Sequence, residues 1–112
     1  MTVRATSQLI VGALMRSVQS AGGNAAVIAR GDPVSGAILV WTLERGRFTG
    51  FLERALRLDG YRFMACGPQV YDNEEEISAY AARRRSRDPD LWIIELDIAD
   101  VERFTADLAL LS

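Results

Sequence analysis

Apolar residues near the start of the chain recur with the spacing of a helix. Between residues 7 and 21 they fall four positions apart, at Ile10, Leu14 and Val18. This pattern is typical of an amphipathic helix with one buried stripe. Thr6 or Ser7 can cap its start, and Gly22-Gly23 can end it because glycine adopts positive φ at low cost. The sequence therefore predicts a first helix over residues 7–21.

Two strands are predicted next, over residues 25–30 and 37–44. The segment between them, Gly31 to Gly36, is rich in turn-forming residues and contains Pro33. We therefore expect these two strands to form a β-hairpin. Residues 38–40 of the second strand are apolar on both faces, which indicates a strand in the centre of the sheet.

A second hairpin is predicted in the middle of the chain. A strand over Arg47 to Leu52 follows the turn at Gly46, and Gly50 marks a bulge or a bend within it. The segments 54–58 and 61–66 then flank Asp59-Gly60, which is a typical two-residue hairpin turn.

The last third of the chain predicts helix, strand and helix. The second helix opens at Asn73, with Glu74 to Glu76 over its positive end, and it stops before Asp88-Pro89. A strand over residues 91–98 follows, and it has Trp92, Ile94, Leu96 and Ile98 on its inward face. A final helix over residues 100–111 has Val101, Phe104, Leu108 and Leu111 on one stripe.

The resulting order, α-β-β-β-β-α-β-α, predicts one α+β domain over residues 1–112. We expect about five strands in an antiparallel or mixed sheet built from hairpins, with about three helices covering mainly one face. A chain of 112 residues has the usual size of one domain, and a composition of 49% hydrophobic and 25% charged residues is close to the globular average.

The composition excludes several kinds of chemistry. The chain has no histidine, which removes Ser-His-Asp and Cys-His catalysis and any His-based zinc site. Its one cysteine, Cys66, cannot form a disulfide within the chain. We therefore expect no catalytic residues, no cofactor and no metal. The sequence favours a non-enzymatic role without excluding an enzyme, because acid-base chemistry would have to use Asp, Glu, Tyr or Arg.

Charge and hydropathy restrict the partners. The net charge is −2, so the molecule as a whole does not attract a polyanion, and any basic site must be local. The beginning of the sequence does not resemble a secretory signal, and no apolar run approaches the roughly 18 residues of a membrane span. We expect a cytoplasmic protein without membrane contact.

The strongest local charge is an arginine cluster at the end of the second helix. It consists of Arg83, Arg84, Arg85 and Arg87. As a binding site, the cluster could hold a phosphate, an RNA or an acidic partner. As a structural feature, it complements the negative end of the helix and pairs with nearby carboxylates such as Asp88 and Asp90.

Four other features each allow a functional and a structural interpretation. The backbone amides of residues 31–36 could bind an anion, but the loop lacks a P-loop pattern and is better explained as a turn. Cys66 could be a nucleophile, although nothing in its neighbourhood in the sequence lowers its pKa. Glu74 to Glu76 could bind a cation but diverge around the helix. Glu95 and Asp97, about 7 Å apart on one strand face, could be a catalytic pair or simply an exposed face.

Aromatic residues suggest an interface. Trp92 is expected in the core, whereas Trp41 and Phe51 are placed on an outer sheet face and could form an exposed patch. Such a patch would most simply join two copies of the chain.

Several segments together resemble a known family. They include the Gly31-Asp32-Pro33 loop and the later run Asp88-Pro89-Asp90-Leu91-Trp92. In their order, these segments resemble a small bacterial family of domains of unknown function, found mainly in alphaproteobacteria. The resemblance covers nearly the whole chain. It implies a small cytoplasmic protein without an assigned activity, and it supplies no functional residues.

These observations favour a non-enzymatic interaction or regulatory module that acts as a homodimer through a sheet face or edge, with an unidentified protein as another candidate partner. The alternative is a module that binds a small ligand or a nucleic acid through the arginine cluster.

Overall fold

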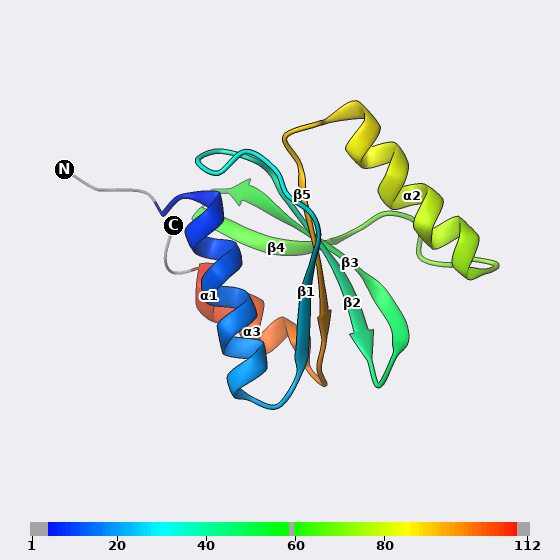
Figure 1. Cartoon of the computed structure of the whole chain (residues 1–112), viewed down its shortest axis with the longest axis horizontal. Coiled ribbons are helices and arrows are strands. Elements are labelled where there is room, and N and C mark those ends of the chain that lie inside the picture. Colours follow the sequence, from blue (N-terminus) through cyan, green and yellow to red (C-terminus); the bar gives the residue numbers. More distant parts are fainter. Residues whose placement is uncertain (1–4, 59, 110–112) are drawn as a thin grey trace.

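The computed structural model describes residues 5–58 and 60–109. In this part of the chain, three helices and five strands follow the predicted order (Figure 1). The elements are α1 (Ser7–Ser20), β1 (Asn24–Ala29), β2 (Ile38–Glu44), β3 (Arg47–Arg57), β4 (Gly60–Cys66), α2 (Glu74–Arg87), β5 (Trp92–Asp97) and α3 (Val101–Ala109). The predicted α+β class is confirmed, and the segments predicted over 47–52 and 54–58 form one strand, β3, which ends at Arg57.

The five strands form one mixed sheet in the order β1-β5-β2-β3-β4. β5 is antiparallel to β1 and parallel to β2, whereas β3 is antiparallel to both of its neighbours, β2 and β4. β2 is the central strand, as expected, and its residues Ile38, Leu39 and Val40 are all completely buried. The predicted hairpin of β3 and β4 is present, although Asp59 of its turn lies outside the described residues.

The first predicted hairpin is wrong, because β5 lies between β1 and β2. Residues 31–36 instead form a connection that holds α1 and β5. The carbonyl oxygens of Pro33 and Val34 accept hydrogen bonds from the first backbone N–H groups of α1, and the Asp32 carbonyl accepts one of 2.7 Å from Trp92 Nε1. A Cβ atom on Gly31 would lie 2.1 Å from the Asp90 carbonyl oxygen, so only glycine permits this approach.

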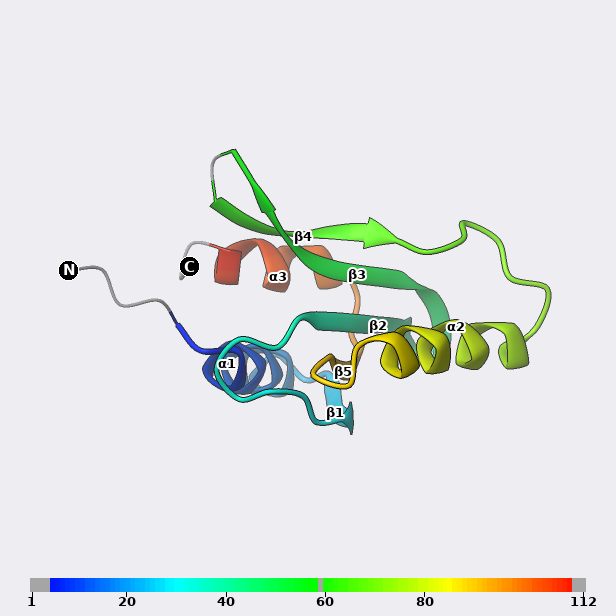
Figure 2. The same ribbon diagram turned by 90° about the horizontal axis from the view of Figure 1, so that it is seen from above.

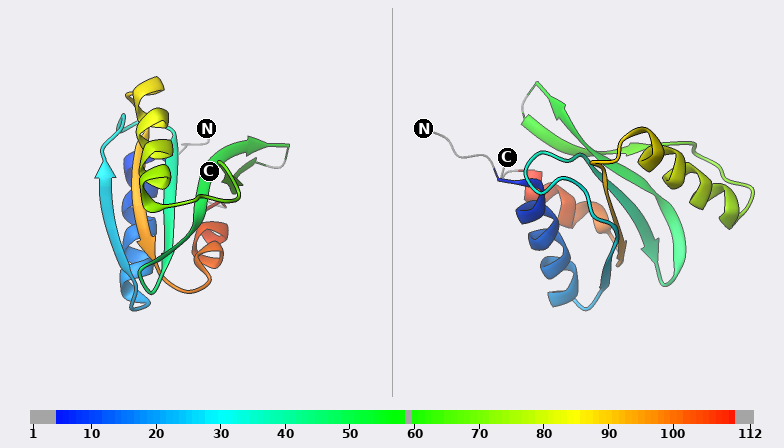
Figure 3. Two further views of the ribbon diagram at one scale, coloured as in Figure 1. Left: turned by 90° about the vertical axis from the view of Figure 1, so that its right-hand side faces the viewer. Right: turned by 45° about the horizontal axis from the view of Figure 1, so that its top comes forward.

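Helices cover both faces of the sheet, which corrects the expectation of one covered face. α1 and α3 pack on one face, and α2 packs on the other (Figures 2 and 3). The reason lies in β5, whose alternate residues are apolar on both sides: Trp92 and Ile94 face α1, while Leu91, just before the strand, and Ile93 face α2.

The two longer helices begin at caps that the sequence indicated. The Thr6 hydroxyl accepts a hydrogen bond from the backbone N–H of Leu9, and Asn73 Oδ1 accepts one of 2.9 Å from that of Glu76. In α3, Phe104 is buried as expected. The positions of Leu108 and Leu111, predicted on the same stripe, lie outside the side chains that the structure describes.

Candidate functional site

The face under α2 carries a cluster of aromatic rings. Its members are Trp41, Phe48, Phe51, Tyr71 and Tyr80, with neighbouring ring centroids 4.9 to 6.4 Å apart. Phe51 lies in the middle of this cluster and is only 2% exposed, so the expected exposed patch of Trp41 and Phe51 is wrong. The reason is that α2 and the segment before it cover this ring. Trp41 is half-buried at the border of the cluster.

A group of polar side chains lies beside these rings. Arg84 donates a hydrogen bond of 2.8 Å from Nη1 to the Tyr80 hydroxyl, and its Nη2 pairs with the Glu53 carboxylate on β3. Nη1 also lies 4.0 Å from Cys66 Sγ. Burial by itself would lower the pKa of Arg84, but the hydrogen bonds to Tyr80 and Glu53 outweigh it and raise the pKa. Arg84 therefore links α2 to the sheet as a charged group.

Cys66 is half-buried within this polar group. Burial raises the pKa of its thiol, and this effect outweighs those of Tyr80 and Arg84, which lower the pKa. A raised pKa keeps the sulfur protonated near neutral pH and makes it a poor nucleophile. These surroundings support the interpretation of Cys66 as an inert thiol.

Tyr71 has a buried hydroxyl without a hydrogen-bond partner among the described residues. Burial raises the pKa of Tyr71, with a smaller contribution from the nearby Tyr80. The hydroxyl packs against Gly67, where a Cβ atom would lie 2.8 Å from it and where φ is +78°. A buried polar group without a partner costs free energy, so a ligand that hydrogen-bonded to it would gain affinity there.

Two cavities open next to this cluster. The larger, of about 650 Å³, lies on the α2 side between β3 and residues 66–71. The smaller, of about 250 Å³, lies on the opposite side of the sheet against the start of α3. Both reach Thr49, Gly50, Phe51 and Ala65. The α2 face therefore combines aromatic rings, a charged pair and open volume.

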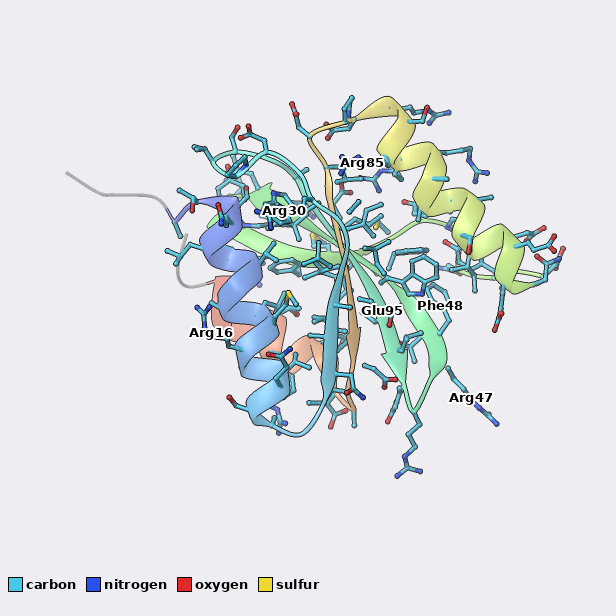
Figure 4. All side chains as sticks on the ribbon, viewed as in Figure 1. Arg16, Arg30, Arg47, Phe48, Arg85 and Glu95 are labelled. Atoms are coloured by element: carbon cyan, nitrogen blue, oxygen red, sulfur yellow. The ribbon has the colours of Figure 1, made fainter. Side chains whose placement is uncertain are left out.

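The structure separates the predicted arginine cluster into two pairs. Arg84 holds Glu53, and Arg85 donates hydrogen bonds of 2.7 and 2.6 Å to the carbonyl oxygens of Arg30 and Leu91. Arg83 and Arg87 are exposed. Figure 4 shows Arg85 directed from α2 towards the sheet. Two of the four arginines therefore stabilise the packing of α2, and the cluster does not form one basic surface.

Three of the other candidate carboxylates, those of Asp32, Asp97 and Glu76, also have structural partners. Asp32 accepts hydrogen bonds at its own carboxylate from the backbone N–H groups of Val34 and Ser35, so these amides do not face an external anion. The hydrogen bond from Ser35 is the main cause that lowers the pKa of Asp32. Asp97 accepts a hydrogen bond of 2.9 Å from Gly46 N, and Glu76 accepts one of 2.9 Å from Asp72 N.

The described residues contain neither a metal-binding cluster nor a membrane-spanning helix. Within residues 5–58 and 60–109, no group of three or more His, Cys, Asp or Glu side chains is placed to hold a metal ion. None of the helices that the structure describes is long and apolar enough to cross a membrane.

Sequence reasoning missed the residues that build the α2 face. Glu53, Tyr71 and Tyr80 lie on three different segments, and no local motif connects them. The only signal was the density of aromatic residues between Trp41 and Tyr80, which indicated a cluster without giving its place in the fold.

Comparisons with known proteins agree on the family. The family model described as "Protein of unknown function (DUF1491)" matches residues 5–106. A search of curated proteins gives no match. The crystal structure of a DUF1491 family protein from Caulobacter crescentus CB15 has 30% sequence identity and a TM-score of 0.76, and the match covers 89% of this chain and 94% of that one. A solution structure of a protein from A. tumefaciens also has 30% identity, with a TM-score of 0.71 over 92% of this chain and 93% of that one. The chain therefore belongs to the DUF1491 family.

Proposed function

We propose that this chain is a non-enzymatic protein-interaction module that acts as a homodimer through the free edge of β1. The observation that carries the proposal is the chemistry of β1, which is an edge strand without a charged residue. Proteins usually protect such edges with charges or proline, because unpaired backbone groups pair readily with another strand.

The side chains of β1 also favour an interface. Val27 and Ile28 are 38% and 50% exposed, and the rest of the strand consists of alanines and Asn24. The register shift between Val27 and Ala29 limits regular pairing to the first part of the strand. A second copy that pairs antiparallel there would extend the sheet across both molecules and place both copies of α1 on the same face.

The edge explains self-association better than the sheet face. Phe51, which the face would need, is buried under α2, and Trp41 is half-buried in the same aromatic cluster. The opposite face is covered by α1 and α3. Of the two routes expected from the sequence, pairing at an edge is therefore the one that the packing leaves open.

Light scattering after size exclusion, at tens of micromolar protein, tests the proposal. We expect a mass near twice the monomer mass of 12.4 kDa. The double variant Val27→Lys with Ile28→Lys should give the monomer mass, because two buried cations would oppose pairing. Leu56→Lys is the matched control, because Leu56 is 63% exposed near the far edge of the sheet and its substitution should leave the dimer intact. A monomeric wild type, or a dimer that survives the double substitution, would contradict the proposal.

A further inference from the structure

Besides its two end strands, β1 and β4, the sheet leaves part of one edge of β3 unpaired, along the N-terminal residues of that strand. β2 pairs with β3 as far as Arg47, but β4 pairs with it only as far as Phe51, opposite Cys66. Beyond Cys66 the chain leaves the sheet towards α2 (Figure 3). Among the described residues, β3 therefore has no neighbouring strand along Arg47 to Gly50 on its outer side. We call this edge, with the two cavities beside it, the β3 notch.

The two cavities lie on opposite faces of the sheet at this edge. The larger is lined by Phe48 and Tyr71 on the α2 side, and the smaller by Thr42 and Val101 on the α3 side. Both are also lined by Gly50. A strand laid along the edge would therefore have one cavity above it and one below it.

We propose that the β3 notch binds an extended peptide segment of a partner protein by strand addition. Successive side chains of a strand point to opposite faces, so a peptide here would place alternate side chains into the two cavities. The space beside Gly50 is open, because a Cβ atom built on it meets nothing within 4 Å. The strand would continue the line of β4 along β3.

The walls of the cavities define the chemistry of this peptide. The α2-side cavity is lined by apolar and aromatic residues together with polar groups, and the Tyr71 hydroxyl, which has no partner among the described residues, lies beside it. Its volume of about 650 Å³ accepts a large apolar side chain. The α3-side cavity is bordered by the exposed carboxylates of Glu44, Asp100 and Glu102.

No arginine lines either cavity, and no described residue forms an ion pair with these three carboxylates. Figure 4 shows Arg47, the nearest arginine on β3, pointing away from the sheet. The surplus of negative charge on the α3 side selects lysine or arginine there. The notch therefore fits a segment in which basic and large apolar residues alternate.

This surface differs from the edge proposed for the dimer. The notch lies on β3, next to the end strand β4, and the dimer edge lies on β1, the end strand on the opposite side of the sheet. A dimer of two chains would therefore carry two notches, and peptide binding does not require dimerisation.

Amide NMR spectra of the labelled protein provide the test, with the blocked peptide acetyl-Lys-Phe-Lys-Leu-Lys-amide as the probe. We expect saturable shifts at residues 47–50, 65–71 and 100–102. The peptide acetyl-Lys-Lys-Phe-Leu-Lys-amide has the same charge without the alternation, and it should bind roughly tenfold more weakly because one large apolar side chain loses its cavity. A peptide with a methyl group on its backbone nitrogens should lose binding, because strand addition needs those donors.

Charge reversal on the protein completes the test. Glu44→Lys with Glu102→Lys should weaken the binding of the alternating peptide by roughly tenfold at low salt, since each exposed ion pair contributes a few-fold to the affinity. Glu74→Lys with Glu75→Lys reverses two exposed carboxylates on α2 and serves as the control, with unchanged affinity expected. Saturable shifts confined to β1, equal binding of the two lysine peptides, or no saturable shift at millimolar peptide would overturn the proposal.

Discussion

The two faces of the sheet are covered by different kinds of side chains. The face under α1 and α3 is closed by aliphatic side chains such as Leu14, Val18 and Ile94, which are all completely buried. The face under α2 is closed by aromatic rings and by the pair of Arg84 and Glu53, and a cavity opens beside it. α2 itself buries only Ile77 and Ala81 among its side chains. From this packing, we expect the first face to contribute more to stability than the second, which contains open volume and polar groups.

The largest expected effect compares one aliphatic residue from each face. Leu14→Ala should lower the free energy of unfolding by about 3 to 4 kcal/mol, because its side chain is completely enclosed. Ile77→Ala should cost about 2 kcal/mol, because Ile77 is 7% exposed and borders the cavity. Urea denaturation measures both. An equal or larger loss for Ile77→Ala would show that the α2 face is as tightly packed as the other.

An intermediate effect is expected at the charged pair under α2. Glu53→Gln leaves the half-buried Arg84 guanidinium without its carboxylate and should cost about 1 to 2 kcal/mol. Glu95→Gln is the matched control, since no described residue pairs with Glu95, and it should change the free energy of unfolding by less than about 0.5 kcal/mol. If the two variants lose equal stability in urea, the pair does not hold α2.

The smallest expected effect is a loss of folding stability at alkaline pH, caused by ionisable groups of the α2 face. Burial raises the pKa of Cys66 from 9.0 and those of Tyr71 and Tyr80 from 10.0. A raised pKa favours the neutral form in the folded state, so this stability is complete below pH 9 and is lost as pH rises through the folded values.

Unfolding in urea between pH 7 and pH 11 measures this loss. In Cys66→Ala, the loss of stability should begin at a higher pH, towards the range where the tyrosines ionise. Leu14→Ala is the control, since it lowers stability at every pH without changing the onset. An unchanged onset in Cys66→Ala would mean that the thiol does not contribute.

The local parts of the fold could be predicted from the sequence. Apolar periodicity, caps and turn residues gave the order of the elements and most of their bounds, because these signals depend on neighbours within a few positions. The buried centre of β2 was also visible, since Ile38 to Val40 is apolar on both faces.

The errors concern contacts between distant segments. The Gly31 to Gly36 segment has the composition of a hairpin turn, and nothing near it reveals that β5, some sixty residues later, separates the two strands: Trp92 Nε1 reaches Asp32 across 60 positions. The partners of the arginines could not be predicted for the same reason. Arg84 finds Glu53 at a separation of 31 positions, and Arg85 finds the Arg30 carbonyl at 55.

The position of β5 inside the sheet has a consequence for how the chain folds. β1 and β2 have no direct pairing, so neither can be completed until β5 has been synthesised and has inserted between them. During translation, α1, β1 and the strands β2 to β4 therefore emerge before the strand that connects β1 to β2 in the sheet. Such late closure raises the contact order and slows folding. Until β5 pairs with it, the uncharged β1 is open on both edges, where another strand can pair with it.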